Sequence, residues 1–325
     1  MARLLSVNGL KTEFRTERGI VKAVNGISYH VDEGEIIGLV GESGCGKSVS
    51  QLSVMQLIPD PPGRIVGGTV EFEGVDLLQY ARNSRDMCDI RGNKISMVFQ
   101  EPMTSLNPAM TINKQMSEVM IEHMGASAGE ARACSIEMLK QVGIPDPGKR
   151  IDDYPHQLSG GMRQRVMIGM AMLCNPKMII ADEATTALDA TIQAQLLELI
   201  YEIVNKHSTA LVMVTHNLGV VARYANRICV MYAGKIVESG TTKEIWANPL
   251  HPYTEGLLSC VPQLGKKLVP IKGLPPSLIN RPETCPFLPR CRFRRDSCFK
   301  EPVAELTNVE GSHMTACNVR LEGKI

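Results

Sequence analysis

The chain has 325 residues, with 35 lysine and arginine residues against 34 acidic ones, so its formal net charge at pH 7 is +1. This balance lacks the strong basic excess that is typical of general nucleic-acid-binding proteins. Apolar residues make up 44% of the chain, enough to build one large core or two smaller ones. No apolar run reaches the roughly 18 residues of a membrane span, and the N-terminus lacks the pattern of a secretion signal. We therefore expect a globular protein that is not secreted.

Short β-strand patterns, in which apolar and polar residues alternate, open the chain. A helix is expected to begin after Lys47 and to continue as far as the proline-rich breaker Pro59–Gly63. The strands predicted before and after this helix cover residues 4–10, 21–31, 35–40, 68–74 and 94–100.

The middle of the chain, from residue 103 to about 174, is mostly helical in pattern, with breaks near Gly125 and Pro145. Strands and helices then alternate again, which indicates an α/β fold. The elements predicted there are a buried strand at 177–183, a helix at 191–206, a strand at 209–216 and a hairpin at 227–240 that turns at Ala233–Gly234. After about Pro249, prolines become frequent and the periodicity fades, so we expect a small, separate C-terminal module.

The stretch "GESGCGKS" matches the pattern G-x-x-x-x-G-K-[ST] and lies between a predicted strand and a predicted helix. Its glycines let the backbone bend so that several N–H groups and a helix N-terminus face a phosphate. The lysine would then reach the β- and γ-phosphates of a nucleotide, and the following hydroxyl would bind Mg²⁺. A glycine turn with a solvated lysine is the alternative. The residues expected to bind the nucleotide here are Gly41, Ser43, Gly44, Cys45, Gly46, Lys47, Ser48 and Val49.

Cys45 lies inside this loop, next to helix-end dipoles and Lys47, so we expect its thiolate form to be favoured. Alkylation of the thiol is then expected to block ATP hydrolysis, and bound ATP is expected to protect it. A sterically shielded, inert thiol is the alternative.

Two acidic residues follow the apolar run "MIIA". Asp182, at the end of the strand, could approach Mg²⁺ directly or through water. Glu183 could orient and polarise the water that attacks the γ-phosphate. The alternative is a solvated start of a loop, which is common for such a pair in isolation.

The run "HQLSGGMRQRVMIGMAM" contains "LSGGM" at Leu158–Met162, which resembles the signature of the ATP-binding cassette family. Gln100 after "MVF" resembles the glutamine of the Q-loop, and "TALD", which ends at Asp189, resembles the D-loop. His216 in "VTHNL" resembles the switch histidine. These motifs follow one another in the order of the family, and the resemblance covers roughly residues 1–255.

This resemblance implies an α/β nucleotide-binding domain of the cassette type. Such a domain has a RecA-like core, an antiparallel β subdomain and an α-helical signature subdomain, here at about 103–172. The expected domains are 1–255, which binds ATP, and 256–325, a small C-terminal module rich in cysteine. The resemblance also implies catalytic roles for Glu183 and His216, and Mg²⁺ contacts from Ser48, Gln100 and Asp182.

The signature motif offers a second anion-binding helix end, because Ser159, Gly160 and Gly161 lie at a predicted helix start. The family implies a head-to-tail dimer in which this end caps the ATP held by the partner cassette. An ordinary serine N-cap is the alternative. Phe14 is the candidate that stacks on adenine, with plain core packing as the alternative.

Two further stretches indicate what the cassette drives. "QEPMTSLNPAMTI" after Gln100, and "NPLHPYTEGLLSCVPQL" with "GLPPSLINRPETCPFLPRC" near the C-terminus, resemble the ATPase subunits of bacterial dipeptide, oligopeptide and nickel importers. The implied partners are a second cassette, commonly a different chain, two transmembrane permease subunits and an extracytoplasmic peptide-binding protein. The implied location is the cytoplasmic face of the membrane.

Three other functions are alternatives to peptide import. A nickel importer shares all the motor motifs, so it stays open. A soluble cassette acting on nucleic acid or ribosomes would carry two cassettes or a long coiled coil after Gln100, and the sequence has neither. A non-catalytic regulatory cassette would lack Glu183 or His216, and both are present.

Four cysteines, Cys285, Cys291, Cys298 and Cys317, follow the spacing C-x5-C-x6-C-x18-C. Structural zinc sites usually contain tight C-x2-4-C pairs, whereas the ligand spacing of iron–sulfur clusters varies widely. The family resemblance also points to a [4Fe–4S] cluster, with zinc and free or disulfide-bonded thiols as alternatives. Such a site would help to order a module that has little core of its own.

Overall fold

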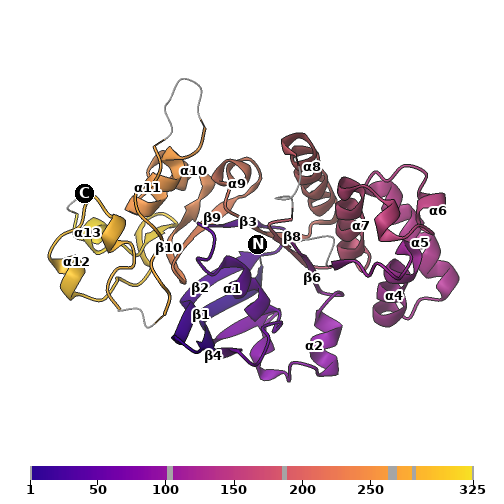
Figure 1. The fold of residues 1–325 in the computed structure, drawn as a ribbon, viewed down its shortest axis with the longest axis horizontal. Coiled ribbons are helices and arrows are strands. Elements are labelled where there is room, and N and C mark those ends of the chain that lie inside the picture. The colour runs from indigo at the N-terminus through magenta and orange to yellow at the C-terminus, as the bar shows by residue number, and fades with distance from the viewer. Residues whose placement is uncertain (1, 101–104, 185–188, 263–268, 280–282, 324–325) are drawn as a thin grey trace. The chain divides into compact units, whose positions relative to one another are not determined.

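Figure 1 shows a computed structural model of the chain, which describes residues 2–100, 105–184, 189–262, 269–279 and 283–323. The chain divides into two compact units. The first comprises Met1–Gln79 and Met213–Ile325, and the second comprises Tyr80–Val212. Among the described residues, no helix is both long and apolar enough to span a bilayer.

An antiparallel sheet with the strand order β2-β1-β4-β5 forms one part of the first unit. Its longest strands pair from Arg3 opposite Asp32 to Thr16 opposite Gly19, so both extend beyond their predicted ends. The hydroxyls of Thr12 and Ser53 hydrogen-bond at 2.7 Å, which ties the first helix to this sheet. The strands are β1 (Arg3–Thr16), β2 (Gly19–Asp32), β4 (Gly63–Phe72) and β5 (Val75–Asp76), followed by the 3₁₀ turn η1 (Leu77–Gln79).

A second row of strands in this unit has the order β11-β12-β10-β9-β3. The strand β3 (Ile36–Val40), the last in this row, is buried throughout and pairs in parallel with β9 (Arg227–Tyr232). The hairpin to β10 (Lys235–Thr241) turns at Ala233 and Gly234, both with positive φ, as predicted. The short strands β11 (Thr307–Glu310) and β12 (His313–Thr315) extend the outer edge of β10.

Helices accompany this row of strands. The helix α9 lies so close to β3 that a Cβ at Gly38 would approach a methyl of Val221 to 2.0 Å. The helical elements of the first unit are α1 (Lys47–Val54), α9 (Leu218–Tyr224), α10 (Thr242–Ala247), α11 (Pro252–Ser259), η3 (Leu288–Arg290), α12 (Ser297–Lys300) and α13 (Asn318–Leu321).

The second unit is mostly helical around one parallel strand pair, β6 (Ile95–Val98) with β7 (Met178–Asp182). The break predicted near Gly125 is present, because Gly125 ends α4 with φ +65 and Ser127 begins α5 with a capping box to Glu130. The helical elements are α2 (Arg85–Ile90), α4 (Ile112–Met124), α5 (Ala128–Gln141), α6 (Pro147–Arg150), η2 (Pro155–Gln157), α7 (Gly160–Met172) and α8 (Ala190–His207). The strand β8 (Ala210–Thr215) crosses the boundary between the units in the sequence.

The end of one predicted helix differs from the structure. The helix after the glycine loop ends at Val54 rather than at the breaker, and β4 already begins at Gly63. The residues after Pro249 belong to the first unit, in which α11 spans Pro252–Ser259. They were expected to form a separate module, but the pairing of β12 with β10 makes them continuous with the strands that carry the glycine loop. The start of the predicted helical region, residues 103 and 104, lies outside the described residues.

Candidate functional site

The glycine loop connects the end of β3 to the start of α1, as the sequence predicted. Gly46 is the N-cap of α1 with φ +103, and a Cβ there would lie 2.2 Å from the carbonyl oxygen of Ala23. A Cβ at Gly41 would lie 2.1 Å from the carbonyl oxygen of Met231. The loop therefore lies directly against the backbone of two strands, and side chains at these positions would push it away.

Lys47 is 4% exposed and points into the loop that precedes it. Its Nζ donates hydrogen bonds to the carbonyl oxygens of Gly41, at 2.8 Å, and Glu42, at 3.2 Å. The ammonium group therefore lies in the concave part of the loop, where a cation can bind phosphate oxygens. Ser48 and Val49 follow in the first turn of α1 and are half-buried, while Ser43 and Gly44 are exposed.

Cys45 behaves differently from the expectation. Its side chain is 5% exposed and its Sγ lies 3.9 Å from Lys47 Nζ. Burial raises the pKa of the thiol, and the attraction of Lys47 only partly offsets this effect. The expected thiolate is therefore wrong, because removing the sulfur from water disfavours its charged form more than the neighbouring cation favours it.

The acidic pair at the end of β7 lies in the second unit. Asp182 is 6% exposed, and Glu183 adopts a left-handed conformation with φ +46, which is uncommon for a residue other than glycine. Gln100 follows β6, and its Nε2 donates a hydrogen bond of 3.3 Å to Glu183 Oε2. The structure thus brings together two residues that the sequence singled out separately.

The signature motif begins α7, as predicted. Ser159 is the N-cap of this helix, and its hydroxyl accepts a hydrogen bond from the backbone N–H of Met162 at 3.3 Å. A Cβ at Gly161 would lie 3.3 Å from Ile192 of α8. Asp189 is the N-cap of α8 and accepts hydrogen bonds from two backbone N–H groups of its first turn. The other residues of "TALD", 186–188, lie outside the described residues.

His216 and Phe14 lie in the first unit. His216 is exposed and follows β8 at the start of α9, whose N-cap is Asn217. Phe14 is half-buried in β1, and its ring lies over Gly63 beside Ile58, since a Cβ at Gly63 would lie 2.6 Å from atoms of both. This contact packs one part of the half-buried ring against β4, and adenine stacking by Phe14 stays a prediction.

The four cysteines of the C-terminal region line one cavity, together with His251, Phe287 and Leu288. Cys298 and Cys317 are buried and form an apolar cluster with Val319, while Cys285 and Cys291 are half-buried. Burial and the nearby thiols raise the pKa of Cys285 to about 11. A ligand that binds these sulfurs as thiolates must therefore supply positive charge.

The spacing of the four sulfurs bears on the zinc alternative. No three of the four Sγ atoms lie within 4.8 Å of one another. Zinc–thiolate bonds of about 2.3 Å in a tetrahedral site would place the sulfurs about 3.8 Å apart. The four thiols therefore line one cavity of about 20 Å³ without forming a ready-made zinc site.

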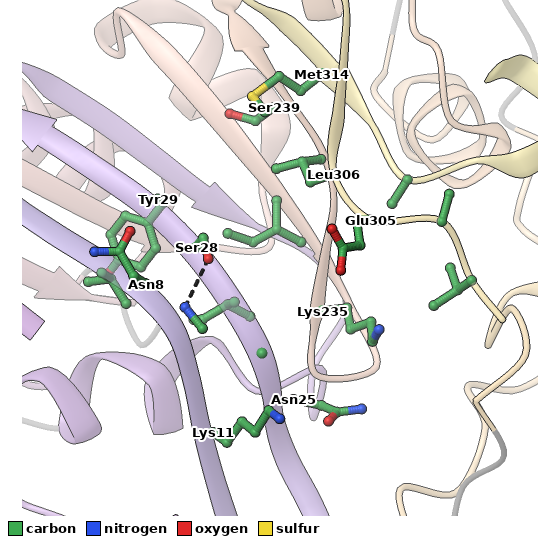
Figure 2. A pocket seen from close by; sticks show the side chains of 18 of the residues that line it. Asn8, Lys11, Asn25, Ser28, Tyr29, Lys235, Ser239, Glu305, Leu306 and Met314 are labelled. Atoms are coloured by element: carbon green, nitrogen blue, oxygen red, sulfur yellow. Dashed lines mark hydrogen bonds between the residues drawn. The ribbon is translucent and has the colours of Figure 1, made fainter. Parts of the chain in front are cut away.

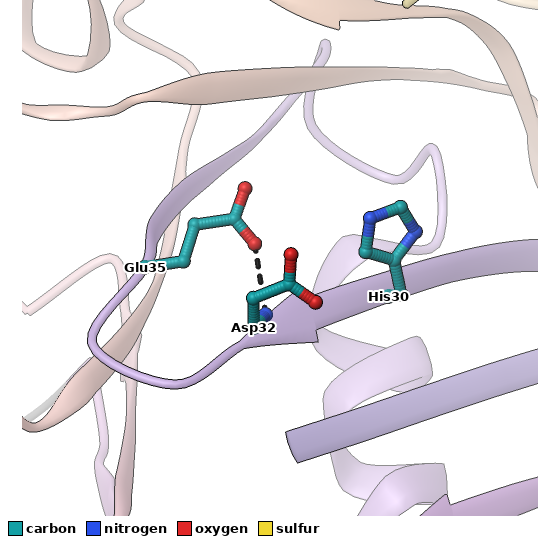
Figure 3. Close-up of side chains that lie close together, drawn as sticks. All are labelled: His30, Asp32 and Glu35. Atoms are coloured by element: carbon teal, nitrogen blue, oxygen red, sulfur yellow. Dashed lines mark hydrogen bonds between the residues drawn. The ribbon is translucent and has the colours of Figure 1, made fainter. Parts of the chain in front are cut away.

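His30, Asp32 and Glu35 form another group, in which one possible ligand atom of each lies within 4.8 Å of the others (Figure 3). Arg3 donates to Asp32 at 2.9 Å, and Arg227 donates two hydrogen bonds, of 2.9 and 3.0 Å, to Glu35. Burial and these two arginines lower the pKa of His30. Because the carboxylates already have cationic partners, the group is an ion-pair network that joins the end of β2 to β9.

A cavity of about 700 Å³ lies between the β1–β2 hairpin, β10 and residues 302–306 (Figure 2). Lys11, Asn25, Lys235 and Glu305 are among the polar residues that line it. The hydroxyl of Ser28 accepts a hydrogen bond from the backbone N–H of Gly9 at 2.9 Å on its wall. No motif in the sequence indicated this cavity.

Comparisons with known proteins now bear on the site. The family model described as "ABC transporter" matches residues 24–186. The "Oligopeptide transport ATP-binding protein AppD" of Bacillus subtilis (strain 168) is 48% identical over 314 residues, which are 96% of this chain and 95% of that protein. The chain belongs to the ABC transporter family.

Other matches extend this result for the cassette. The model "Oligopeptide/dipeptide transporter, C-terminal region" matches residues 237–298, and the "Dipeptide transport ATP-binding protein DppD" of Bacillus subtilis (strain 168) is 49% identical, over 92% of this chain and 89% of that protein. The solved structures include the dimeric structure of a post-hydrolysis state of the ATP-binding cassette MJ0796 bound to ADP and Pi, whose sequence is 26% identical to this chain. It has a TM-score of 0.65 and covers 73% of this chain and 98% of that one. The predicted membership of the cassette ATPases and their α/β fold are thereby confirmed.

Sequence reasoning missed some residues near these sites. His251 and Phe287 line the cysteine cavity, and Arg290 contacts the phosphate loop at Glu42. The stretch "HPY" at 251–253 enters the sequence analysis only through a family resemblance. Its helix-start proline and flanking aromatic residues were the available signal.

Proposed function

We propose that this cassette is the ATP-hydrolysing subunit of an importer of dipeptides or oligopeptides. The observation that carries the proposal is the near full-length identity to relatives named for oligopeptide and dipeptide transport. The match of residues 237–298 to the C-terminal region of such transporters supports it independently of the motor motifs. These names favour peptides over nickel, which the motor motifs alone left open.

The proposed chemistry assigns one task to each group. Lys47 and the loop amides bind the phosphates, while Ser48, Asp182 and Gln100 contact Mg²⁺. Glu183 orients the attacking water, and His216 contacts the γ-phosphate. The hydrogen bond between Gln100 and Glu183 supports this assignment, because it places an amide where it can orient the carboxylate.

ATP would act as the link between two cassettes. We propose that Ser159, Gly160 and Gly161 present the start of α7 to the nucleotide held by a partner cassette. The serine cap leaves the first backbone N–H groups of the glycines available to an anion. Binding of ATP would close the pair, and hydrolysis would open it.

The remaining partners follow from the proposed import function. They are two transmembrane permease subunits and an extracytoplasmic peptide-binding protein, with the cassette at the cytoplasmic face of the membrane. The second cassette is proposed to be a different chain. We propose residues 1–255 as the ATP-binding domain, with a helical subdomain at about 103–172, and residues 256–325 as the C-terminal extension.

Cys285, Cys291, Cys298 and Cys317 are proposed to bind a [4Fe–4S] cluster. Support comes from the four thiols that line one cavity and from their sequence spacing, which lacks the tight pairs of structural zinc sites. When bound, the cluster would cross-link segments that share little apolar core. Iron and sulfide analysis of anaerobically purified protein tests this, and a colourless protein with bound zinc would contradict it.

The central experiment is transport by the reconstituted complex. The chain is purified with its co-expressed permease and partner cassette, placed in vesicles and supplied with binding protein and ATP. We expect di- or oligopeptides to stimulate ATP hydrolysis and to accumulate in the compartment that contains the cassettes. Glu183→Gln should abolish both while ATP still binds, whereas Glu202→Gln, at an exposed position of α8, should behave as wild type. Stimulation by Ni²⁺ instead of peptides would overturn the peptide assignment.

A further inference from the structure

The segment between Cys285 and Cys291 contacts the glycine loop at residues 41–48, which is called the phosphate loop from here on. Arg290 directly precedes Cys291, and its guanidinium donates hydrogen bonds of 2.6 and 2.9 Å to the two carboxylate oxygens of Glu42. Glu42 is the second residue of the loop "GESGCGKS". The Arg290 side chain is 3% exposed, so this two-pronged ion pair is shielded from solvent on the arginine side.

Other groups hold the same two residues in place. Arg290 also donates to the hydroxyl of Tyr232 at 3.3 Å and to the carbonyl oxygen of Lys272 at 3.1 Å. The backbone N–H of Glu42 donates to the hydroxyl of Tyr253 at 2.8 Å. Both the side chain and the backbone of Glu42 are therefore fixed by residues from the C-terminal half of the chain.

Aromatic packing makes the connection rigid. Phe287, which lies between Cys285 and Cys291 in the sequence, packs edge-on against Tyr232 with ring centroids 5.3 Å apart. Its ring centroid lies 5.5 Å from that of Tyr253. A displacement of the cysteine segment would therefore move Phe287 and Arg290 together, and both contact the groups that hold Glu42.

Glu42 also connects this network to the phosphate-binding lysine, because its carbonyl oxygen accepts a hydrogen bond from Lys47 Nζ at 3.2 Å. A carboxylate in an anion-binding loop would repel the phosphates if no cation faced it. The guanidinium of Arg290 supplies that cation without entering the concave part of the loop.

We propose that Arg290 is a positioning residue for ATP, which neutralises and orients Glu42 and so couples the cysteine segment to the affinity of the phosphate loop. This inference rests on ATP binding at the loop, as in the function proposed above. The C-terminal segment would then contribute to nucleotide binding as well as to the stability of the C-terminal region.

The test measures binding of a fluorescent ATP analogue with Mg²⁺ to the full-length chain. Arg290→Gln is expected to raise the dissociation constant about tenfold or more, since it leaves an unpaired carboxylate beside the phosphates. Arg292→Gln is the matched control, because Arg292 lies two residues after Arg290 but its side chain is 69% exposed and pairs with Glu255, which is 45% exposed. Its dissociation constant should stay within about twofold of wild type.

A double-mutant cycle separates this role from a general effect on folding. Glu42→Gln removes the charge that Arg290 neutralises, so Arg290→Gln should cost less than about twofold in that background. Arg290→Lys keeps the charge but loses the two-pronged contact, so this variant should bind the ATP analogue with intermediate affinity. It also provides a second test if the Arg290→Gln variant does not fold. In the assembled complex, the KM for ATP should rise more than kcat falls.

Cys291→Ser tests the coupling to the cysteine segment. It should weaken binding of the analogue in the chain that carries Arg290, but add little in the Arg290→Gln chain. Wild-type affinity in both Arg290 variants would overturn the inference, as would equal losses with and without the Glu42 charge. If the wild-type chain itself fails to bind the analogue, the proposed function is overturned as well, and the two failures are thus distinguishable.

Discussion

Glu238 of β10 provides the sharpest test of how the C-terminal strands are attached. Its side chain is fully buried and accepts three hydrogen bonds. The donors are the backbone N–H groups of Leu250, at 2.8 Å, and His251, at 2.7 Å, and the ring Nε2 of His313, at 2.7 Å. One carboxylate thus joins β10 to the start of α11 and to β12.

Glu238→Gln keeps the size of the side chain but replaces one acceptor oxygen with a donor NH₂ group. At least one backbone N–H would then face another donor inside the protein. Hydrogen bonds to a charged group contribute about 1.5–3 kcal/mol each, and breaking a buried charged contact costs about 3–5 kcal/mol. We therefore expect a local destabilisation of about 3 kcal/mol or more.

Native-state hydrogen exchange measures this effect at the affected amides. A loss of about 3 kcal/mol corresponds to exchange about a hundredfold faster at Leu250, His251 and β12. Glu244→Gln serves as the comparison, since Glu244 also contacts the C-terminal region, through Ser312, but from a partly exposed position. Exchange less than about threefold faster in Glu238→Gln would refute the reasoning, because a threefold change corresponds to less than about 1 kcal/mol.

Three further predictions concern the phosphate loop and acid stability. Gly46→Ala should weaken ATP binding at least about tenfold in a direct binding assay, because the new Cβ would lie 2.2 Å from the oxygen of Ala23; near-normal affinity would contradict this. Cys45 should react with iodoacetamide far more slowly than the exposed Cys88, as burial raises its pKa; mass spectrometry showing equal rates would refute it. Burial opposes ionisation of Glu244, but hydrogen bonds from residues 241 and 312 outweigh it and lower its pKa to about 2. The stability it contributes, no more than about 1 kcal/mol because the group is partly exposed, should be present above pH 4.5 and lost as the pH falls toward 2. Acid titration of Glu244→Gln should lack this component, and an unchanged profile would count against it.

Short-range features were predictable from the sequence. The glycine loop, the helix start at Ser159 and the turn at Ala233–Gly234 depend on backbone conformation and on contacts within a few residues. Residue type alone largely decides such features, because only certain side chains permit positive φ or cap a helix. The pattern of these motifs also sufficed to identify the cassette family, which the comparisons confirmed.

Tertiary structure decided the environment of each reactive group. The sequence predicted a thiolate at Cys45 from its neighbours in the chain, but packing buries the sulfur and raises its pKa. The sequence set the four cysteines apart as a module, whereas the structure joins their segment to the phosphate loop through Arg290 and Glu42, which are 248 positions apart. Burial and long-range pairing depend on which segments pack together. The spacing of residues along the chain does not show which distant segments will meet. Eight consecutive residues therefore determine the type of loop, while the partner of its carboxylate, Arg290, comes from the other end of the chain.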